Sequence, residues 1–233
     1  MNPYLAALLT FAIAIAFLRS MDFFAHRGFI ESKLSRKFIH IGTGPIFVLC
    51  WLMFPDVPSA RYLAALIPLL ITVQFLLVGT GVIKDEAAVQ AMTRSNNPKE
   101  ILRGPLFYGI MFVVLTIVYW KDSPIGITAL MVMCGGDGIA DIIGRRIRSP
   151  KLFWSPEKSL AGSLSVFAGG ALLTTLILFI YVSVGVFAAP FSMYLFPTAV
   201  IALGAMLIES LPFKDIDNIT LVVVSALLGH LVF

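Results

Sequence analysis

Two aspartates inside an apolar segment are the residues of this sequence best placed to do chemistry. Asp137 and Asp141 lie in the stretch 133–146, MCGGDGIADIIGRR, and are four residues apart. On a helix this spacing puts both side chains on one face, about 6 Å apart along the axis. Ionised groups are costly at membrane depth and usually face a bundle interior or a wet cavity. The pair is therefore a candidate metal or proton site, and the alternative is a buried charge pair that serves only packing.

Three glycines surround the first of these aspartates. Gly135, Gly136 and Gly138 each weaken a helix by about 1 kcal/mol, and they let a ligand approach the backbone closely. We expect them to interrupt the helix beside a cavity, as broken helices in membranes usually do. Close helix packing through small residues is the alternative, because glycines are common at helix contacts in bilayers.

A basic segment follows the aspartates. Residues 145–159 contain five Lys and Arg, and the terminal sequence SPEKS predicts a helix that starts at Ser155. Helix N-termini and basic side chains together bind phosphates. Lys158, which is followed by Ser159 and Gly162, is therefore a candidate phosphate-binding residue.

Other polar residues stand next to apolar segments. His40 follows Arg36 by four residues and Lys37 by three, so the three side chains can share one helix face. His40 could equally be a hydrogen-bonded packing residue. Glu209 and Asp217 could complete a metal shell, although Asp217 is explained about as well as the cap of the last helix.

The composition is that of an integral membrane protein. Hydrophobic residues make up 59% of the chain, charged residues make up 13%, and the mean hydropathy is +0.94. Several apolar runs approach the roughly 20 residues that cross a bilayer as a helix, and none has the alternating pattern of a membrane barrel. We predict an all-α fold, a single domain over residues 1–233, with the lipid bilayer and no nucleic acid as a partner.

The apolar runs predict eight membrane spans, or seven if the short first or last run does not cross. The predicted spans are Tyr4–Leu18, Phe38–Phe54, Tyr62–Val78, Pro105–Trp120, Ile125–Ile143, Leu160–Val182, Phe191–Ile208 and Asn218–Phe233.

The connections between these spans alternate in charge. Fifteen of the 17 Lys and Arg fall in residues 19–37, 79–104, 145–159 and 210–217. By the positive-inside rule these four connections are cytoplasmic, and most Tyr and Trp lie toward the opposite ends of the spans. Most of the unusual polar residues then fall on the cytoplasmic side, which predicts one site there. The N-terminus resembles neither a secretory signal nor a transit peptide, which fits a prokaryotic product or a chain that is already processed. Of these we expect a protein of the prokaryotic plasma membrane.

Five motifs resemble a known family in order and spacing. RKFIHIGTG, EILRGPLFYG, MCGGDGIADIIGRR, SPEKSLAGSLSVF and ESLPFKDIDNIT resemble the membrane-bound polyprenol kinases, which include phytol kinase. The resemblance implies a CTP-dependent, Mg²⁺-requiring kinase that phosphorylates the primary hydroxyl of a long isoprenoid alcohol, such as phytol or a geranylgeraniol-like chain. CTP-dependent diacylglycerol kinases and dolichol kinase are similar at a greater distance. The sequence has no Walker-type or dinucleotide motif, so the nucleotide would need a different cradle.

Two other functions are weighed against this one. Phosphatidate cytidylyltransferases share an Asp, Gly-Arg and Ser-Pro-x-Lys pattern, but their C-terminal signature is missing here. An ion-coupled transporter could also use paired intramembrane aspartates and broken helices. No inverted repeat is visible, and the charges gather at one membrane face instead of at the midplane, which argues against transport.

The kinase hypothesis assigns roles to particular residues. Mg²⁺ would be held by Asp137 and Asp141, with Glu209 or Asp217 as additional ligands. The catalytic candidates are Asp137, Asp141, His40 and Lys158, and which of them is the base stays open. The residues expected to contact CTP are Arg36, Lys37, Arg103, Gly135, Gly136, Arg145, Lys158, Ser159, Gly162 and Asn218.

Overall fold

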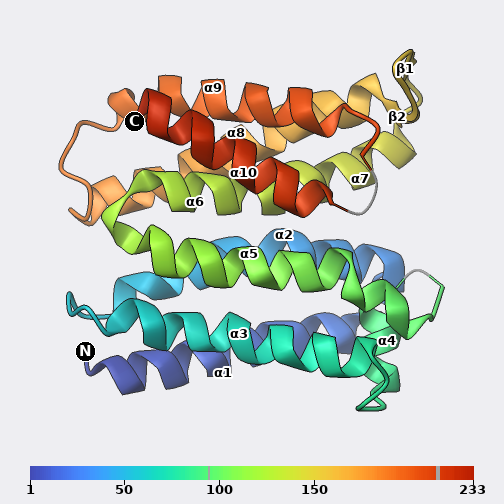
Figure 1. Cartoon of the computed structure of the whole chain (residues 1–233), viewed down its shortest axis with the longest axis horizontal. Coiled ribbons are helices and arrows are strands. Elements are labelled where there is room, and N and C mark those ends of the chain that lie inside the picture. Colours follow the sequence, from blue (N-terminus) through green and yellow to red (C-terminus); the bar gives the residue numbers. More distant parts are fainter. Residues whose placement is uncertain (94, 214–215) are drawn as a thin grey trace. The chain divides into compact units, whose positions relative to one another are not determined.

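All eight predicted apolar runs form helices in the computed structural model, which describes residues 1–93, 95–213 and 216–233 (Figure 1). The chain divides into two compact units, Met1–Ile117 and Val118–Phe233. The single domain expected over residues 1–233 stays a prediction. The all-α class is confirmed, with one small β-hairpin added.

The first unit packs four long helices together with short helical turns. Helix α1 packs against α2 and α3, and α3 also packs against η2. The elements are α1 (Pro3–His26), α2 (Ser32–Cys50), the 3-10 turn η1 (Trp51–Met53), α3 (Ala60–Gly79), α4 (Glu86–Met92), the 3-10 turn η2 (Pro98–Leu102) and α5 (Gly104–Val118).

The two basic connections of the first unit meet at one end of its helices. Arg36 Nη1 donates a hydrogen bond to the Thr93 carbonyl oxygen at 2.6 Å, which joins the start of α2 to the segment after α4. Arg61 lies in the first turn of α3, and its guanidinium donates to the Ile117 carbonyl oxygen near the end of α5. Within this unit, the predicted separation of the basic connections from Arg61 is therefore confirmed.

The second unit is organised around α8. This helix packs against η4, α7 and α9, and α10 packs against α9 and α6. The core of the second unit contains Val132, Val166, Ile201 and Leu221. The elements are η3 (Trp120–Asp122), α6 (Pro124–Met131), the π-helical turn η4 (Val132–Asp137), α7 (Gly138–Arg146), β1 (Lys151–Leu152), β2 (Ser155–Ser159), α8 (Leu160–Ser183), α9 (Ser192–Glu209) and α10 (Asp217–Val232).

The glycine-rich segment is a π-helical turn and not a break in the helix. An ideal Cβ on Gly135 would lie 2.8 Å from the Gly169 carbonyl oxygen, and one on Gly169 would lie 2.5 Å from the Gly135 carbonyl oxygen. The backbones of η4 and α8 thus approach too closely for any side chain. The expected interruption takes the milder form of one wide turn, and the packing alternative is realised for Gly135 and Gly136.

The prediction of a helix that starts at Ser155 is wrong, because residues 155–159 pair with β1 as an antiparallel strand. Helix α8 begins instead at Leu160, where the Ser159 hydroxyl oxygen accepts a hydrogen bond from the Gly162 amide at 3.2 Å. The error has a simple cause, since Ser-Pro is compatible with an edge strand as well as with a helix start.

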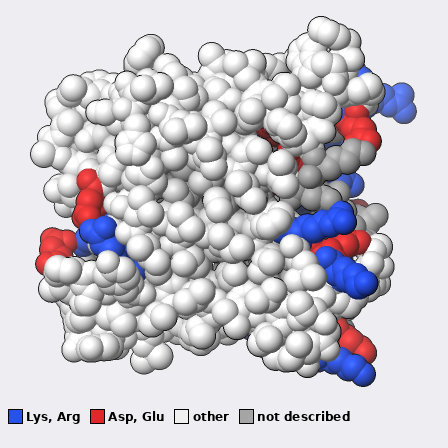
Figure 2. Space-filling model, in the orientation of Figure 1, with Lys and Arg blue, Asp and Glu red and all other residues white. Residues whose placement is uncertain are grey.

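Six helical segments in the described part of the chain are long and apolar enough to cross a membrane. They are Pro3–His26, Ala60–Gly79, Pro98–Val118, Pro124–Arg146, Leu160–Ser183 and Ser192–Glu209. Helix α10 is apolar but has only 16 residues, so a count of seven or eight spans is not confirmed. The visible sides of the helices are almost entirely uncharged, and Lys, Arg, Asp and Glu gather at helix ends (Figure 2). This distribution fits a protein whose helices face lipid.

Aromatic side chains gather at one end of the second unit. The Phe187 ring lies 5.6 Å from that of Tyr181 and 5.8 Å from that of Tyr194, measured between ring centroids. The Tyr119 hydroxyl and His230 Nε2 are 2.9 Å apart, and burial raises the pKa of the Tyr119 phenol. Aromatic rings of this kind settle at the membrane–water boundary, so this end fits the aromatic belt predicted for these spans.

The contact between η4 and α8 can be tested by adding one methyl group. Gly169→Ala should lower the free energy of unfolding by about 1 to 3 kcal/mol, because its Cβ would overlap the Gly135 carbonyl oxygen. Gly104→Ala is the matched control, since a Cβ there meets no heavy atom within 4 Å. Thermal unfolding in detergent measures both variants, and equal melting temperatures would contradict the close packing.

Candidate active site

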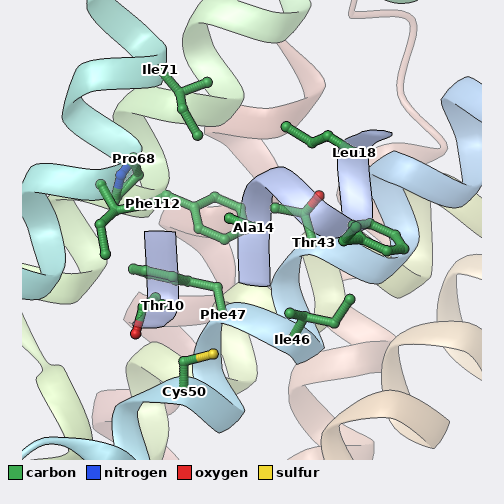
Figure 3. Close-up of a pocket in the computed structure, with 12 residues that line it drawn as sticks. Thr10, Ala14, Leu18, Thr43, Ile46, Phe47, Cys50, Pro68, Ile71 and Phe112 are labelled. Atoms are coloured by element: carbon green, nitrogen blue, oxygen red, sulfur yellow. The ribbon is translucent and has the colours of Figure 1, made fainter. Parts of the chain in front are cut away.

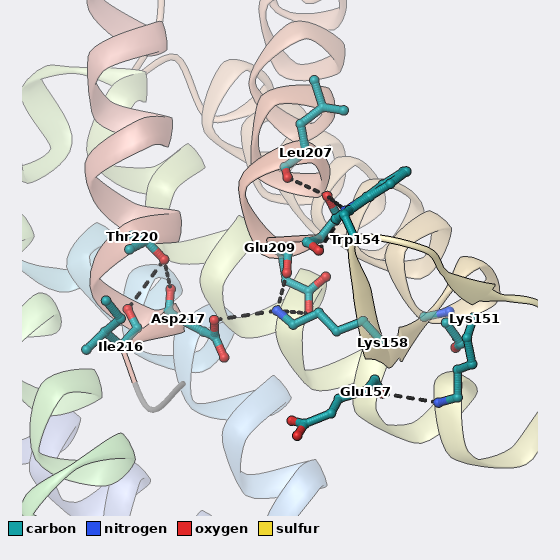
Figure 4. Close-up of polar contacts among 12 residues, drawn as sticks. Lys151, Trp154, Glu157, Lys158, Leu207, Glu209, Ile216, Asp217 and Thr220 are labelled. Carbon is teal, nitrogen blue, oxygen red and sulfur yellow. Dashed lines mark hydrogen bonds and ion pairs between the residues drawn. The ribbon is translucent and has the colours of Figure 1, made fainter. Parts of the chain in front are cut away.

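Lys158 is the centre of a charged cluster in the second unit (Figure 4). Its ammonium lies 3.0 Å from Glu209 Oε1 and 3.6 Å from Asp217 Oδ1, and it also donates to the Glu209 carbonyl oxygen. The three side chains are 16%, 12% and 30% exposed, respectively. The cluster therefore joins β2, the last residue of α9 and the first residue of α10 in a mostly buried position.

Asp137 adds a further negative charge to this cluster. Its carboxylate and that of Asp217 both repel the Glu209 carboxylate, which Lys158 attracts. Asp137 ends the π turn η4, and η4 packs against both α9 and α10. Three of the four predicted metal ligands thus come from distant parts of the sequence to within electrostatic range of Glu209.

The donor set of this cluster suits magnesium. Mg²⁺ prefers oxygen ligands and is usually held by one or two carboxylates together with substrate phosphates. In the described ranges, no group of three or more His, Cys, Asp or Glu is arranged to hold a metal ion by itself. The oxygen donors of the cluster are thus of the chemical kind that Mg²⁺ takes, but they do not make up a metal site by themselves.

Asp141 faces a different partner. Its Oδ1 accepts a hydrogen bond from Arg145 Nε at 2.8 Å, one helical turn further along α7. The Asp141 side chain is 22% exposed and that of Arg145 is 59% exposed. Such exposed pairs contribute little stability, typically about 0.2 to 1 kcal/mol. A ligand could separate them cheaply, so both residues stay candidates for the roles predicted above.

Ser159 and Gly162 have structural contacts at the start of α8. Beside the cap described above, an ideal Cβ on Gly162 would lie 3.5 Å from Gly144 Cα and 3.2 Å from Ser159 Oγ. The backbones of α7 and α8 thus lie within van der Waals reach at Gly162, and a Cβ there would crowd only the Ser159 hydroxyl. Asn218 is buried in the first turn of α10, next to Asp217. The predicted CTP contacts of these three residues stay predictions, as do those of Gly135 and Gly136.

The remaining predicted residues belong to the first unit. The rings of His40 and Tyr108 are 4.5 Å apart between centroids, and the Tyr108 hydroxyl donates to the His40 carbonyl oxygen at 2.6 Å. Arg36 is held by Thr93, as described above. Lys37 lies on α2 beside Arg36, and Arg103 directly precedes α5. The roles predicted for these four residues stay predictions.

Trp154 is a residue of this region that the sequence analysis did not select. Its indole Nε1 donates to the carbonyl oxygen of Ser210 at 3.0 Å and to its hydroxyl at 3.3 Å, which fastens the hairpin to the end of α9 (Figure 4). The available signal was an aromatic pair, Phe153 and Trp154, inside a basic loop. That pattern is equally typical of a membrane-surface anchor.

Apolar helices of membrane-spanning length and a cluster of lysine and carboxylates at their ends define an integral membrane protein with an enzyme-like polar site. Comparison with known proteins gives the family. The chain is 41% identical over 230 residues to probable phytol kinase 1 of Oryza sativa subsp. japonica, covering 98% of this chain and 73% of that protein. It is 40% identical over 209 residues to farnesol kinase of Arabidopsis thaliana, covering 89% and 68%, respectively. The chain belongs to this family of isoprenoid-alcohol kinases.

The comparisons also bear on other predictions. Phytol kinase 1 of Arabidopsis thaliana is 36% identical over 222 residues, covering 94% of this chain and 73% of that protein. No family model and no solved structure matches the chain. The relatives named here are plant proteins described as chloroplastic, so the expected prokaryotic plasma membrane is not borne out. The polyprenol kinase resemblance is confirmed.

The structural role of the Lys158 cluster can be measured without any substrate. Lys158→Gln should lower the free energy of unfolding by about 1 to 3 kcal/mol, because it removes the cation that bridges Glu209 and Asp217. Lys121→Gln is the control, since Lys121 lies in η3, which precedes α6. The Lys158 cluster lies toward the other end of the segment formed by α6, η4 and α7. Chemical or thermal unfolding of both variants in the same detergent is the measurement, and equal losses would argue against a bridging role for Lys158.

Proposed function

We propose that this protein transfers the γ-phosphoryl group of CTP to the primary hydroxyl of a long isoprenoid alcohol, phytol or a geranylgeraniol-like chain, with Mg²⁺ as cofactor. The observation that carries the proposal is the cluster of Lys158 with Glu209 and Asp217, with Asp137 beside it, in a chain of the phytol kinase and farnesol kinase family. CTP and Mg²⁺ come from the motif resemblance, and the carboxylate oxygens of the cluster are of the kind that Mg²⁺ takes.

Phosphoryl transfer depends mainly on positioning and on neutralising phosphate charge, so a site needs cations and metal-binding carboxylates side by side. Asp137 and Asp141 would hold Mg²⁺, with Glu209 or Asp217 as additional ligands, and the bound ion would neutralise charge on the nucleotide phosphates. Lys158 is positioned by Glu209 and Asp217, and its ammonium can donate to a phosphate oxygen. Arg103 and Arg145 are proposed to clamp phosphates, with Arg36 and Lys37 as further contacts to CTP.

The acceptor alcohol must lose its proton as the new bond forms. The base would be whichever of Asp137, Asp141 and His40 does not bind the metal; these residues lie at the end of η4, on α7 and on α2, respectively. We place the reaction at the membrane face that carries the basic connections, where the apolar tail of the alcohol can stay in lipid while its hydroxyl meets the nucleotide.

The transferred group distinguishes a kinase from a cytidylyltransferase. When the purified protein is given a prenol and CTP labelled in either the γ or the α phosphate, only the γ label should appear in the lipid product. The reason is that the cytidylyltransferase signature is missing from residues 209–233 while the kinase motifs are present. Recovery of α label in lipid would replace the proposal with nucleotidyl transfer.

The carboxylates of Asp137 and Asp141 should be needed for turnover and not for folding. We expect Asp137→Asn and Asp141→Asn to insert and purify normally, to lose turnover by orders of magnitude, and to need more Mg²⁺ for the activity that remains. The matched control is Asp122→Asn, an exposed position in η3. Activity and melting temperature are measured on each preparation.

Two outcomes would argue against these assignments. Loss of folding in parallel with loss of activity would mean that the carboxylates serve only to neutralise buried cations. Full activity in well-folded Asp137→Asn would remove that residue from the site.

A further inference from the structure

A groove lies beside the Lys158 cluster, between the β-hairpin, the end of α9 and the middle of α10. Its volume is about 410 Å³, and its walls include Trp154, Leu207, Leu211 and Val224. Small-molecule sites in proteins usually have volumes of roughly 300 to 1,000 Å³. The lining is almost entirely apolar and the groove is open to the outside of the helices, where lipid is expected. An apolar chain could therefore enter it from the side.

Trp154 is held as a fixed wall of this groove. Its two hydrogen bonds to Ser210 set the position of the indole ring, and Ser210 Oγ in turn donates to the Leu207 carbonyl oxygen at 2.7 Å. The Trp154 side chain is 44% exposed, whereas its neighbour Phe153 is 90% exposed and does not line the groove. A rigid aromatic surface contacts an apolar chain at a low cost in side-chain entropy.

One wall residue of the groove is next in sequence to a member of the charged cluster. Ser210 lines the groove and directly follows Glu209, whose carboxylate and carbonyl oxygen both bind Lys158. The site thus has a long apolar part and a polar end within one residue of the proposed phosphoryl-transfer groups. This is the distribution of polarity in an isoprenoid alcohol, which has one hydroxyl on an apolar chain.

A cavity in the first unit suits such a chain less well (Figure 3). Its volume is about 50 Å³, and it is lined by Phe47, Cys50, Phe112 and residues of α1 and α3. The hydroxyls of Thr10 and Thr43, which also line it, donate to the carbonyl oxygens of Ala6 and Ile39 in their own helices. The cavity is therefore small, and both of these hydroxyl donors are already used.

We propose that the groove at Trp154 binds the isoprenoid chain of the acceptor alcohol, with the hydroxyl at the Ser210 end facing Lys158 and Glu209. Trp154, Leu207 and Val224 contact the chain, and Trp154 is a binding residue for the alcohol. The inference rests on the proposed kinase function and adds to it the place where the lipid substrate binds.

Kinetics of matched variants tests the proposal. Trp154→Ala should raise the KM for phytol by about tenfold or more and leave the KM for the nucleotide unchanged, while Phe153→Ala should behave like the wild type. Leu207→Trp should also raise the KM for phytol, because it fills the groove without removing any side-chain hydrogen bond. Equal effects of Trp154→Ala and Phe153→Ala, or a change confined to the nucleotide KM, would overturn it.

A binding measurement separates this inference from the kinase function itself. A phytol analogue carrying a photoreactive diazirine on its chain is bound to the wild-type protein without nucleotide and irradiated, and labelled peptides are identified by mass spectrometry. Labels at Trp154, Leu207, Leu211 or Val224 that excess phytol suppresses support the proposal, even if the same preparation transfers no phosphate. Labels at Phe47 or Phe112, or labels in the groove that phytol does not suppress, overturn it.

Discussion

The ion pairs of Lys158 with Glu209 and Asp217 are the interaction on which the site depends. They connect a hairpin to two helix ends that are separated from it by some 50 to 60 residues of sequence. Mostly buried carboxylates are costly unless a cation accompanies them, so Lys158 makes it possible for Glu209 and Asp217 to approach Asp137. The same arrangement keeps a cation and several carboxylates together, which is the combination that phosphoryl transfer uses. Folding and the proposed chemistry therefore rely on the same few atoms.

The helices could be predicted because the hydrophobic pattern determines them almost alone. Every predicted apolar run is helical, and segments such as Leu160–Ser183 begin and end within a residue or two of the expected bounds. The hairpin could not be predicted in the same way, because Ser155-Pro156 suits both a helix start and an edge strand. Only the tertiary setting decides between them, since β2 pairs with β1 and Ser159 caps α8. The π turn could not be predicted either, although the sequence contains its glycines.

The site was predictable in its residue types and less so in its contacts. Asp137 was selected because an ionised group inside an apolar segment is costly. Lys158 was selected because it stood at an expected helix start, where phosphates bind, and Glu209 and Asp217 were selected as possible metal ligands. The identity of each partner was not available from spacing, except for Asp141 and Arg145, whose separation by one helical turn permits an ion pair. Trp154 was missed because its role depends on Ser210, which lies 56 residues away in the sequence.

The π turn at Val132–Asp137 also has a consequence for the rotational phase of the helix that contains it. A π turn accommodates one extra residue, and each residue of an α-helix turns the chain by about 100°. If residues 132–137 were regular α-helix, the side chains of α7 would therefore point in directions about 100° away from their present ones relative to α6. The direction in which Asp137 and Asp141 face is thus set by the number of backbone units before them. A deletion of a single apolar residue in this turn can therefore be absorbed by its conversion to regular α-helix, whereas a deletion in the regular helix of α6 would turn both carboxylates away from their present surroundings.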